Sequence, residues 1–342
     1  MTRRLLALAA LCASGCMTTR YLAQASYGQF DLLAKARPID EVIADPDVSL
    51  RVRTLLAGIP DIKAYGAKRG LDTHKNYKTY VELPDDAAVW FVGASKPLAF
   101  EPRQWCFPIA GCFAGLGWFD REDAFDHRDQ LLAEGWDAFA RPAAAYSTGG
   151  WFPDPVLSAM LSEGDDAWAE LANVILHESV HATVFIPDEP FFNEAFAEYV
   201  ADRMADDWVR ERFGEASAEL AAYRESQADR AVRTARELRA YDDLAALYAG
   251  HEPDAVKLTK KAAIIDAMVA DLQLRYRPDN ASLIELRVYR AAGDGFATVQ
   301  AACGGSLERM LAAGKRLRRA DFTKELEDNL GHVLAHMADL CR

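Results

Sequence analysis

The sequence has no excess of basic residues. Of its 342 residues, 39 are Lys or Arg and 52 are Asp or Glu, which gives a formal net charge of −13. Nucleic-acid-binding proteins need a basic face, so no nucleic-acid partner is expected. The sequence also lacks internal repeats, low-complexity stretches and long Gly/Ser linkers. With 51% hydrophobic residues, it is long enough for one large domain or two ordinary ones.

The N-terminal segment is too short for a membrane-spanning helix. Its apolar run, Leu5–Ala13, follows two arginines and has nine residues, too few to cross a bilayer. The small residues Ala13-Ser14-Gly15 then precede Cys16, which is the order of a secretory signal. The segment resembles the lipobox of bacterial lipoproteins, although Ala13 stands where a leucine is most often seen. That resemblance implies removal of residues 1–15 and a lipidated Cys16.

The same resemblance implies a location. A lipidated Cys16 would anchor the protein to a membrane of the bacterial cell envelope, facing the periplasm, and we expect the outer membrane. The alternative is an ordinary secretory signal that is cut near Cys16. Both interpretations predict export from the cytoplasm.

Cysteines are few. One of the six lies in the predicted signal and another is Cys16, which leaves four that can form disulfides after export. Four cysteines allow three pairings. We favour Cys106–Cys112, whose separation suits a local loop clamp, together with Cys303–Cys341. A zinc knuckle at the first pair is disfavoured by its spacing and by the lack of a second ligand pair nearby.

The predicted order of elements is helices, a small sheet and a helical half, which indicates an α+β fold. Tyr21 to about Leu71 has a helical pattern with predicted breaks at Pro38, Pro46 and Pro60. Strands and irregular strand segments follow, with one helix among them, and then nearly continuous helix from Pro155. The predicted segments are strands at Ala87–Ala94, Trp136–Ala140 and Ala143–Thr148, irregular strand at Trp105–Phe119, and helices at Arg121–Glu134, Val209–Tyr248 and Val256–Tyr276.

An H-E-x-x-H pattern lies at His177-Glu178-Ser179-Val180-His181. Positions i and i+4 of a helix share one face, so His177 and His181 can bind one zinc ion. Glu178 can reach the attacking water as general base. The alternative is a solvated surface helix. Apolar neighbours instead predict a mostly buried segment, where an unliganded His-Glu-His cluster would be costly: Leu171, Val174, Ile175, Val184 and Phe185.

A second helix supplies further candidates. Pro187–Phe192 is predicted to form a turn, and a helix reading NEAFAEYVADRM is predicted to begin at Asn193. Glu194, 13 residues past the second histidine, can be the third zinc ligand and leaves the open fourth position of a catalytic site. Glu198 is predicted to accept the N–H of a ligand imidazole, with Asp202 as a weaker candidate. The alternative is a solvated acidic helix face.

These motifs resemble known families. H-E-x-x-H followed by N-E-x-x-x-E is the pattern of the gluzincins, the thermolysin-like metallopeptidases. The wider sequence is similar to a family of bacterial lipoproteins described as predicted aminopeptidases. The segments that carry this similarity are YLAQASYGQFDLL, ARPIDEVI, WCFPIAGC, AYSTGGWFPDPV, HESVHATVFI and FFNEAFAEYVAD. The resemblance implies a zincin-like catalytic region at 16–208 and a helical region at 209–342 that packs on it. Gly115-Leu116 stands where a Tyr-Arg pair is expected, which leaves substrate specificity open.

The expected chemistry is hydrolysis of a peptide or protein substrate with one Zn²⁺ bound. Glu178 accepts the proton of the attacking water, and a further donor holds the oxyanion. Tyr146, Tyr289 and Tyr199 are the candidates for that donor. The motif does not distinguish an aminopeptidase from an endopeptidase. A non-catalytic envelope lipoprotein with a structural zinc is the alternative from another class, and Glu178 argues against it because such a site needs no general base.

Two other patterns allow hypotheses. Ala143–Thr148 is either a strand whose edge orients the substrate or an ordinary core strand. His332 and His336 are also four residues apart, but no glutamate accompanies them. We interpret them as a helix face near the C-terminus.

Overall fold

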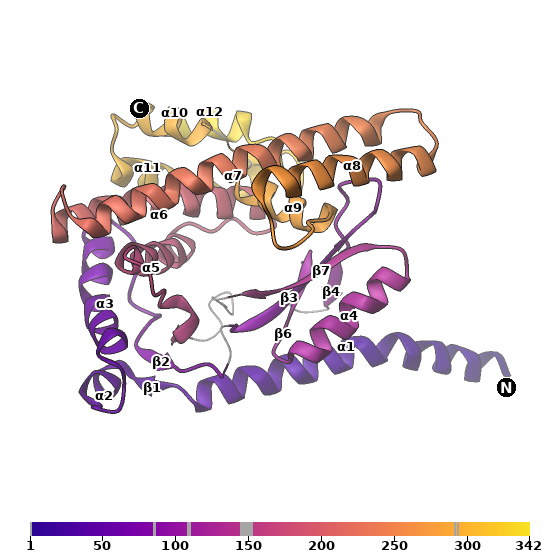
Figure 1. Ribbon diagram of the computed structural model, residues 1–342, viewed down its shortest axis with the longest axis horizontal. Coiled ribbons are helices and arrows are strands. Elements are labelled where there is room, and N and C mark those ends of the chain that lie inside the picture. The colour runs from indigo at the N-terminus through magenta and orange to yellow at the C-terminus, as the bar shows by residue number, and fades with distance from the viewer. Residues whose placement is uncertain (1, 85–86, 108–110, 144–152, 291, 293) are drawn as a thin grey trace.

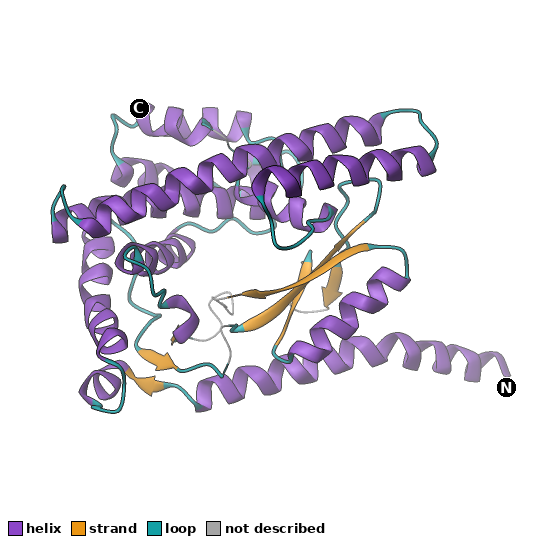
Figure 2. Cartoon of the chain, viewed as in Figure 1, coloured by secondary structure: helices purple, strands orange, loops and turns teal. Residues whose placement is uncertain are grey.

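The computed structural model describes residues 2–84, 87–107, 111–143, 153–290, 292 and 294–342. Its fold is α+β, 61% helical with small sheets, which confirms the predicted class (Figure 2). In Figure 1 a hairpin of two long helices crosses the top of the molecule, and the N-terminal helix runs along the bottom. The largest sheet and a covering helix lie between them.

The N-terminal helix α1 (Thr2–Ala34) contains both the predicted signal and Cys16. Its N-terminal end projects beyond the other elements in Figure 1. The second half contacts β6 (Gly115–Trp118), where the Gln24 amide donates to Gly117 O at 3.2 Å and accepts from Phe119 N at 3.1 Å. Within the described ranges, no helix is both long and apolar enough to cross a bilayer.

Two of the three predicted proline breaks are correct. Pro38 separates α1 from α2 (Ile39–Ala44), and Pro46 separates α2 from α3 (Leu50–Lys68). The break at Pro60 is wrong, because Pro60 lies inside α3. An internal proline costs about 3 kcal/mol. Fully buried neighbours such as Ile59 and Ile62 hold α3 in the core and offset that cost.

In the described part of the chain, the strands form three small sheets. An antiparallel sheet has the order β6–β3–β7, a hairpin joins β4 to β5, and the third sheet has the order β1–β2–β8. The hairpin places Cys106 opposite Cys112, and these residues form a disulfide. The strand predicted at Ala143–Thr148 lies outside the described residues except for Ala143, the last residue of β7. The strands are β1 (Arg37–Pro38), β2 (Thr79–Val81), β3 (Val89–Ser95), β4 (Trp105–Phe107), β5 (Gly111–Phe113), β7 (Asp137–Ala143) and β8 (Val156–Leu157).

A helix covers one face of the β6–β3–β7 sheet. Helix α4 (Arg121–Ala133) packs on β3 and β7, and the contact buries Val92, Leu116 and Leu131. His127 of α4 lies edge-on between Trp105 and Trp118, with ring centroids 5.8 and 5.3 Å away. This layer forms a small hydrophobic core of its own.

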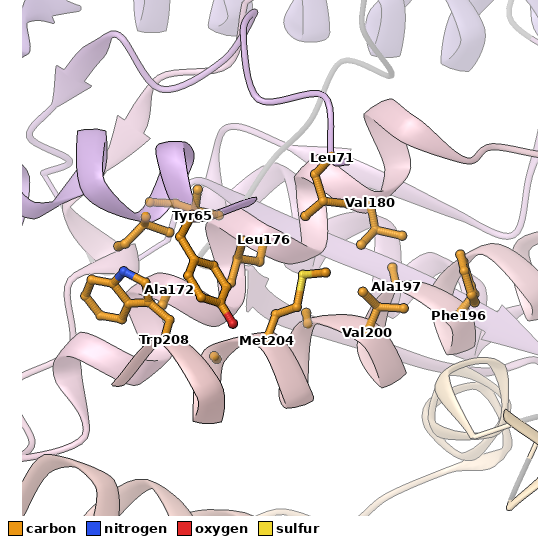
Figure 3. Packing of buried hydrophobic residues seen from close by; sticks show 14 of the residues in the cluster. Tyr65, Leu71, Ala172, Leu176, Val180, Phe196, Ala197, Val200, Met204 and Trp208 are labelled. Atoms are coloured by element: carbon orange, nitrogen blue, oxygen red, sulfur yellow. The ribbon is translucent and has the colours of Figure 1, made fainter. Parts of the chain in front are cut away.

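The main core lies where α5 (Ala167–Thr183) packs on α6 (Pro190–Phe213) and α3. Figure 3 shows Leu176 and Val180 of α5 facing Val200 and Met204 of α6. Helix α5 ends four residues before Pro187, and α6 begins at Pro190 instead of at the predicted Asn193. A proline suits the first helical position because its missing N–H has no partner there.

The loop between α5 and α6 is closed by Asn193. Its side chain accepts from Ile186 N at 2.9 Å and donates to Ile186 O at 2.7 Å. Phe185 was expected to be buried, but it is 63% exposed. Helix α5 ends at Thr183 and the backbone is extended at Val184, so Phe185 does not follow the buried face of the helix.

The charged stretch predicted as one helix is two helices. Helix α6 continues to Phe213, Gly214 (φ 98°) ends it, and α7 (Ala218–Ala249) follows. The expected boundary between residues 208 and 209 therefore lies within α6. Helix α7 pairs with α8 (Asp254–Leu272) in the predicted hairpin. The remaining helices are η1 (Ser158–Met160), α9 (Asn280–Tyr289), α10 (Gly295–Ala302), α11 (Leu307–Gly314), η2 (Arg319–Asp321) and α12 (Gly331–Leu340).

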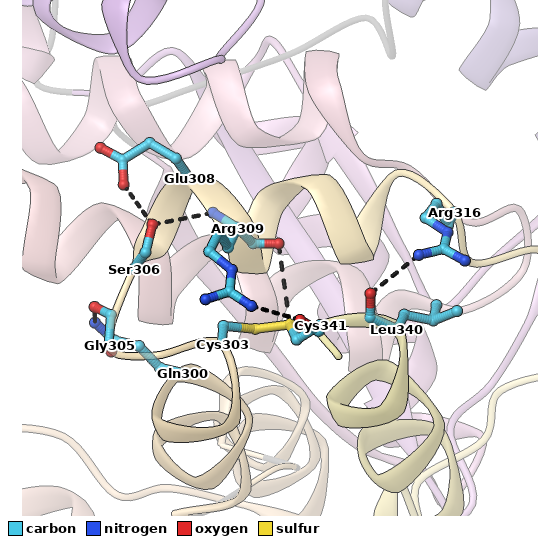
Figure 4. The surroundings of a disulfide bond; sticks show 9 residues. All are labelled: Gln300, Cys303, Gly305, Ser306, Glu308, Arg309, Arg316, Leu340 and Cys341. Atoms are coloured by element: carbon cyan, nitrogen blue, oxygen red, sulfur yellow. Dashed lines mark hydrogen bonds between the residues drawn. A yellow bond between two sulfur atoms is a disulfide. The ribbon is translucent and has the colours of Figure 1, made fainter.

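A second disulfide joins the last helices. Cys303 ends α10, Cys341 ends α12, and the two are bonded. Figure 4 shows Arg309 beside this bond, where its guanidinium donates to Cys341 O at 2.6 Å. The pairing is the one that we favoured from the sequence.

Helix α9 is anchored at its first residue. Asn280 is fully buried, and its amide donates to Lys96 O at 2.9 Å and accepts from the Tyr248 hydroxyl at 2.7 Å. Its backbone N–H donates to Asp137 Oδ2 at 3.1 Å. These bonds fix α9 between the sheet and the α7–α8 hairpin. The other end of α9 carries Tyr289.

Candidate metal centre

Two histidines of α5 and one glutamate of α6 converge. The Nε2 atoms of His177 and His181 lie 3.1 Å apart. Glu194 approaches both, with Oε2 3.4 Å from His177 Nε2 and Oε1 3.4 Å from His181 Nε2. Within the described part of the chain, these residues form the one group of three or more His, Cys, Asp or Glu with ligand atoms all within 4.8 Å.

The spacing of these atoms fits a zinc ion. Zinc binds nitrogen and oxygen at about 2.0–2.2 Å in a tetrahedron, so neighbouring ligand atoms lie about 3.3–3.6 Å apart. The two nitrogens are 3.1 Å apart, and each lies 3.4 Å from a different oxygen of Glu194, so all these separations are close to that range. Two imidazoles and one carboxylate are also a known donor set for zinc. The residues present therefore fit the ion that the sequence pattern implies.

Helix packing explains why the three candidate ligands meet. Val180 and Ser179 on α5 face the core, which turns His177 and His181 away from it on successive turns. Helix α6 packs along α5 and brings Glu194, near its start, to the same place. The ligand side chains remain partly accessible, at 13%, 17% and 27% exposure for His177, His181 and Glu194.

The three ligands and Glu178 are coupled electrostatically. Burial alone would raise the pKa of Glu194, but hydrogen bonds with His177 and His181 and their charges hold that pKa well below its usual range. Burial lowers the pKa of His177, yet the Glu194 hydrogen bond and the charges of Glu178, Glu194 and Glu198 raise it overall. Burial raises the pKa of Glu178, against the charges of both histidines. The cluster therefore favours a carboxylate at Glu194.

The second nitrogen of His177 faces Glu198. His177 Nδ1 lies 3.8 Å from Glu198 Oε2, on the side away from Glu194. Asp202, the weaker candidate for this position, instead accepts from the Asn173 amide at 2.9 Å. Glu198 is therefore the carboxylate placed to accept the His177 N–H.

The candidate oxyanion donors differ in position. The Tyr289 ring lies 6.4 Å from the His177 ring, centroid to centroid. Burial raises the pKa of Tyr289 well above its usual value, and the charge of Glu194 adds to this. Tyr199 points elsewhere, because its hydroxyl donates to Gln300 Oε1 at 2.6 Å. Tyr146 lies outside the described residues, so Tyr289 is the described candidate beside the ligands.

Tyr77, which the sequence did not suggest, lies close enough to Glu178 for the charge of that carboxylate to act on its hydroxyl. Tyr77 is buried and has a left-handed backbone with φ 61°. Its N–H donates to Asp154 O at 2.8 Å. Burial raises its pKa well above the usual value, followed by the charges of Glu178 and Asp154. Strained backbone of this kind is concentrated at functional sites.

The His332–His336 pair lies on α12, in agreement with the predicted helix near the C-terminus. The side chains are 44% and 47% exposed. The pair is not part of the candidate metal-binding group of three residues identified among the described residues. His332 Nε2 lies 3.8 Å from Glu327 and His336 Nε2 lies 3.7 Å from Asp321, each with a different carboxylate.

Comparison with known proteins identifies the family. A family model described as "Putative aminopeptidase" matches residues 20–328. The chain belongs to this family. The aminopeptidase match contains His177, Glu178, His181 and Glu194 and extends past Tyr289, while Cys16 precedes it. No curated protein and no solved structure matches the chain. Family membership points to a peptidase, in agreement with the activity that the resemblance implied.

Gly115 and Leu116 lie in β6, at the position where the Tyr-Arg pair was expected. A Cβ atom at Gly115 would lie 2.1 Å from the Phe91 ring. Phe91 therefore fills the space that a larger side chain at this point of β6 would need.

Proposed function

We propose that the protein is a zinc-dependent peptidase whose metal ion is held by His177, His181 and Glu194. The observation that carries this proposal is the convergence of two imidazole nitrogens, 3.1 Å apart, on one carboxylate, each nitrogen 3.4 Å from one of its oxygens, which are separations on the scale of a zinc tetrahedron. Family membership supports peptide-bond hydrolysis independently of that geometry. The pattern H-E-x-x-H with a glutamate from the next helix supports the gluzincin assignment.

The residues around the site can perform the reaction. Zinc, when bound, polarises the scissile carbonyl and makes water acidic enough to react near neutral pH. Glu178 accepts the proton of the attacking water and passes it to the leaving amine. The hydroxyl of Tyr289 donates a hydrogen bond to the developing oxyanion. Glu198 accepts the remaining N–H of His177 and holds that ring in place.

The preferred substrate in this proposal is a peptide with a free N-terminus, from which the enzyme removes the first residue. The family description supports removal of N-terminal residues, while the site residues alone fit an endopeptidase equally well. Aminoacyl reporter substrates and internally quenched peptides, assayed side by side, separate the two. Hydrolysis of the reporters alone supports the aminopeptidase, and cleavage of N-terminally blocked peptides supports the endopeptidase.

We also propose that Cys16 carries a lipid that anchors the enzyme to the cell envelope. The support is the signal-like segment before Cys16 and the start of the family match only at residue 20. Expression in a bacterium with labelled palmitate should label the wild type, whereas Cys16→Ser should remain unlabelled. Equal labelling of both proteins would contradict the anchor.

Metal analysis of the purified protein tests the central proposal. The wild type should contain about one zinc ion per chain and hydrolyse peptide substrates. Glu178→Gln should keep the zinc and lose turnover, because only the general base changes. A folded wild-type protein with well below one zinc per chain would contradict the proposal, as would a fully active Glu178→Gln variant.

A further inference from the structure

The carboxylate of Glu198 has different partners on its two oxygens. Oε1 is 3.1 Å from an amino nitrogen of Arg290 and 3.7 Å from one of Arg230. Oε2 is 3.8 Å from Nδ1 of His177. The Glu198 side chain is only 14% exposed. Two guanidinium groups therefore converge on one oxygen and leave the other for the ligand histidine.

The two arginines come from distant parts of the chain. Arg230 lies midway along α7, and its second amino nitrogen donates to Glu170 Oε1 of α5 at 3.3 Å. Arg290 is the residue that ends α9, directly after Tyr289. Their side chains are 35% and 27% exposed. The helical half thus places two positive charges immediately behind the metal-binding helices.

The arrangement suits support of a metal ligand. A histidine that binds a metal through Nε2 keeps its proton on Nδ1 and needs an acceptor for it. A carboxylate buried beside that ring is costly unless cations and hydrogen bonds compensate it. Because the arginines bind Oε1 alone, they set the direction of Oε2. An approach of roughly 1 Å would bring Oε2 and His177 Nδ1 to hydrogen-bond distance.

We propose that Arg230 and Arg290 are positioning residues of the metal site, which hold Glu198 so that Oε2 orients the His177 imidazole toward the metal ion. The inference rests on the proposed function, since it gives the arginines a role only if the three ligands bind a metal. Neither arginine contacts the substrate in this account; both act through Glu198. The proposal also gives helix α7 a role at the metal site, because this helix carries Arg230.

Zinc affinity is the readout that tests this. The dissociation constant for zinc is measured by competition with a chelator for the wild type, Arg230→Met and Arg290→Met. Each variant should bind zinc about tenfold more weakly, the scale for losing an outer partner of a ligand. Turnover of the zinc-loaded enzyme should fall while KM stays within about twofold. The matched control is Arg236→Met, also on α7, whose guanidinium bonds Asp271 at 2.7 Å, and it should retain wild-type affinity.

A double variant separates this role from general stabilisation. In a Glu198→Gln background, either arginine substitution should add little further loss of zinc affinity, because its effect passes through the missing carboxylate. An equal loss in that background would overturn the proposal. So would Arg230→Met and Arg290→Met variants that bind zinc as tightly as the control.

The failure of the inference is distinguishable from failure of the proposed function. If the wild type binds zinc and hydrolyses peptides but the arginine variants behave like Arg236→Met, only the positioning role is wrong. If the folded wild type binds no zinc, both are wrong. If a methionine variant does not fold, Arg230→Lys and Arg290→Lys replace it in the test. These variants keep the positive charge but lose the planar guanidinium group with its several N–H donors. They should show an intermediate loss of zinc affinity, and wild-type affinity in both would overturn the proposal.

Discussion

The Nε2 atoms of His177 and His181 lie 3.1 Å apart on successive turns of α5. This separation is close to the edge of a zinc tetrahedron, and Glu194 lies 3.4 Å from each nitrogen. Two imidazoles alone could share a hydrogen bond at that distance. The carboxylate that approaches both nitrogens from a second helix favours a common metal ion between the three.

Glu178→Gln should lower kcat by roughly 10²–10⁴-fold, because the amide cannot accept a proton from the attacking water. Zinc content should remain at the wild-type level, since Glu178 is not a ligand in this account. Glu211→Gln is the control, on α6 and paired with Arg69 at 2.5 Å. It should leave activity unchanged. Loss of zinc from Glu178→Gln would show that this residue binds the metal instead.

Tyr289→Phe should lower kcat by roughly 10²-fold with little change in KM, because it removes one donor to the oxyanion. Tyr199→Phe is the matched control, since its hydroxyl donates to Gln300 of α10. Steady-state kinetics of both variants on one substrate decide the question. Equal kcat values for the two variants would remove Tyr289 from the mechanism.

Stability should depend on His127 in mild acid. Burial, followed by the charge of Arg103, lowers the pKa of His127 to about 4, from an ordinary value of 6.5. Between these pH values the unfolded chain binds a proton that the folded protein does not. The free energy of unfolding therefore falls as pH drops from about 6.5 to about 4, by roughly 2–3 kcal/mol.

Denaturant unfolding of His127→Phe at pH 7 and pH 4.5 measures this contribution. The variant should lose less stability on acidification than the wild type. His127 Nδ1 is buried and has no hydrogen-bond partner among the described residues, so phenylalanine loses no bond there. Identical pH dependence in both proteins would assign the acid sensitivity to other groups.

The Cys303–Cys341 disulfide should stabilise the fold more than Cys106–Cys112 does. It closes a loop of 38 residues against six, and loop-closure entropy gives about 4 against about 2 kcal/mol. Urea unfolding of Cys303→Ser/Cys341→Ser and Cys106→Ser/Cys112→Ser double variants compares the two. A larger loss in the second variant would contradict this ranking.

The sequence predicted the elements whose signals are local. The H-E-x-x-H pattern and Glu194 were found from spacing alone, because a helix repeats its faces at i and i+4. Pro38 and Pro46 marked real helix ends, since a proline removes a backbone donor. Pro60 misled because the packing of its neighbours in the core, which sequence does not display, offsets the cost of a proline inside α3.

Tertiary contacts decided the rest. Nothing in the sequence distinguishes Arg230 from the other arginines of α7, and only the crossing of α7 over α5 and α6 brings it to Glu198. Tyr289 and Tyr199 were equal candidates until the packing of α9 and α10 separated them. Tyr77 carries no motif, and the effect of the Glu178 charge on it depends on packing between segments that are distant in the sequence.

Anomalous diffraction at the zinc edge, from crystals of the wild-type protein, tests the central claim most directly. The account predicts one peak about 2.0–2.2 Å from Nε2 of His177, Nε2 of His181 and a carboxylate oxygen of Glu194. A zinc peak located elsewhere, for example between His332 and His336, or no peak in protein that hydrolyses peptides, would contradict it.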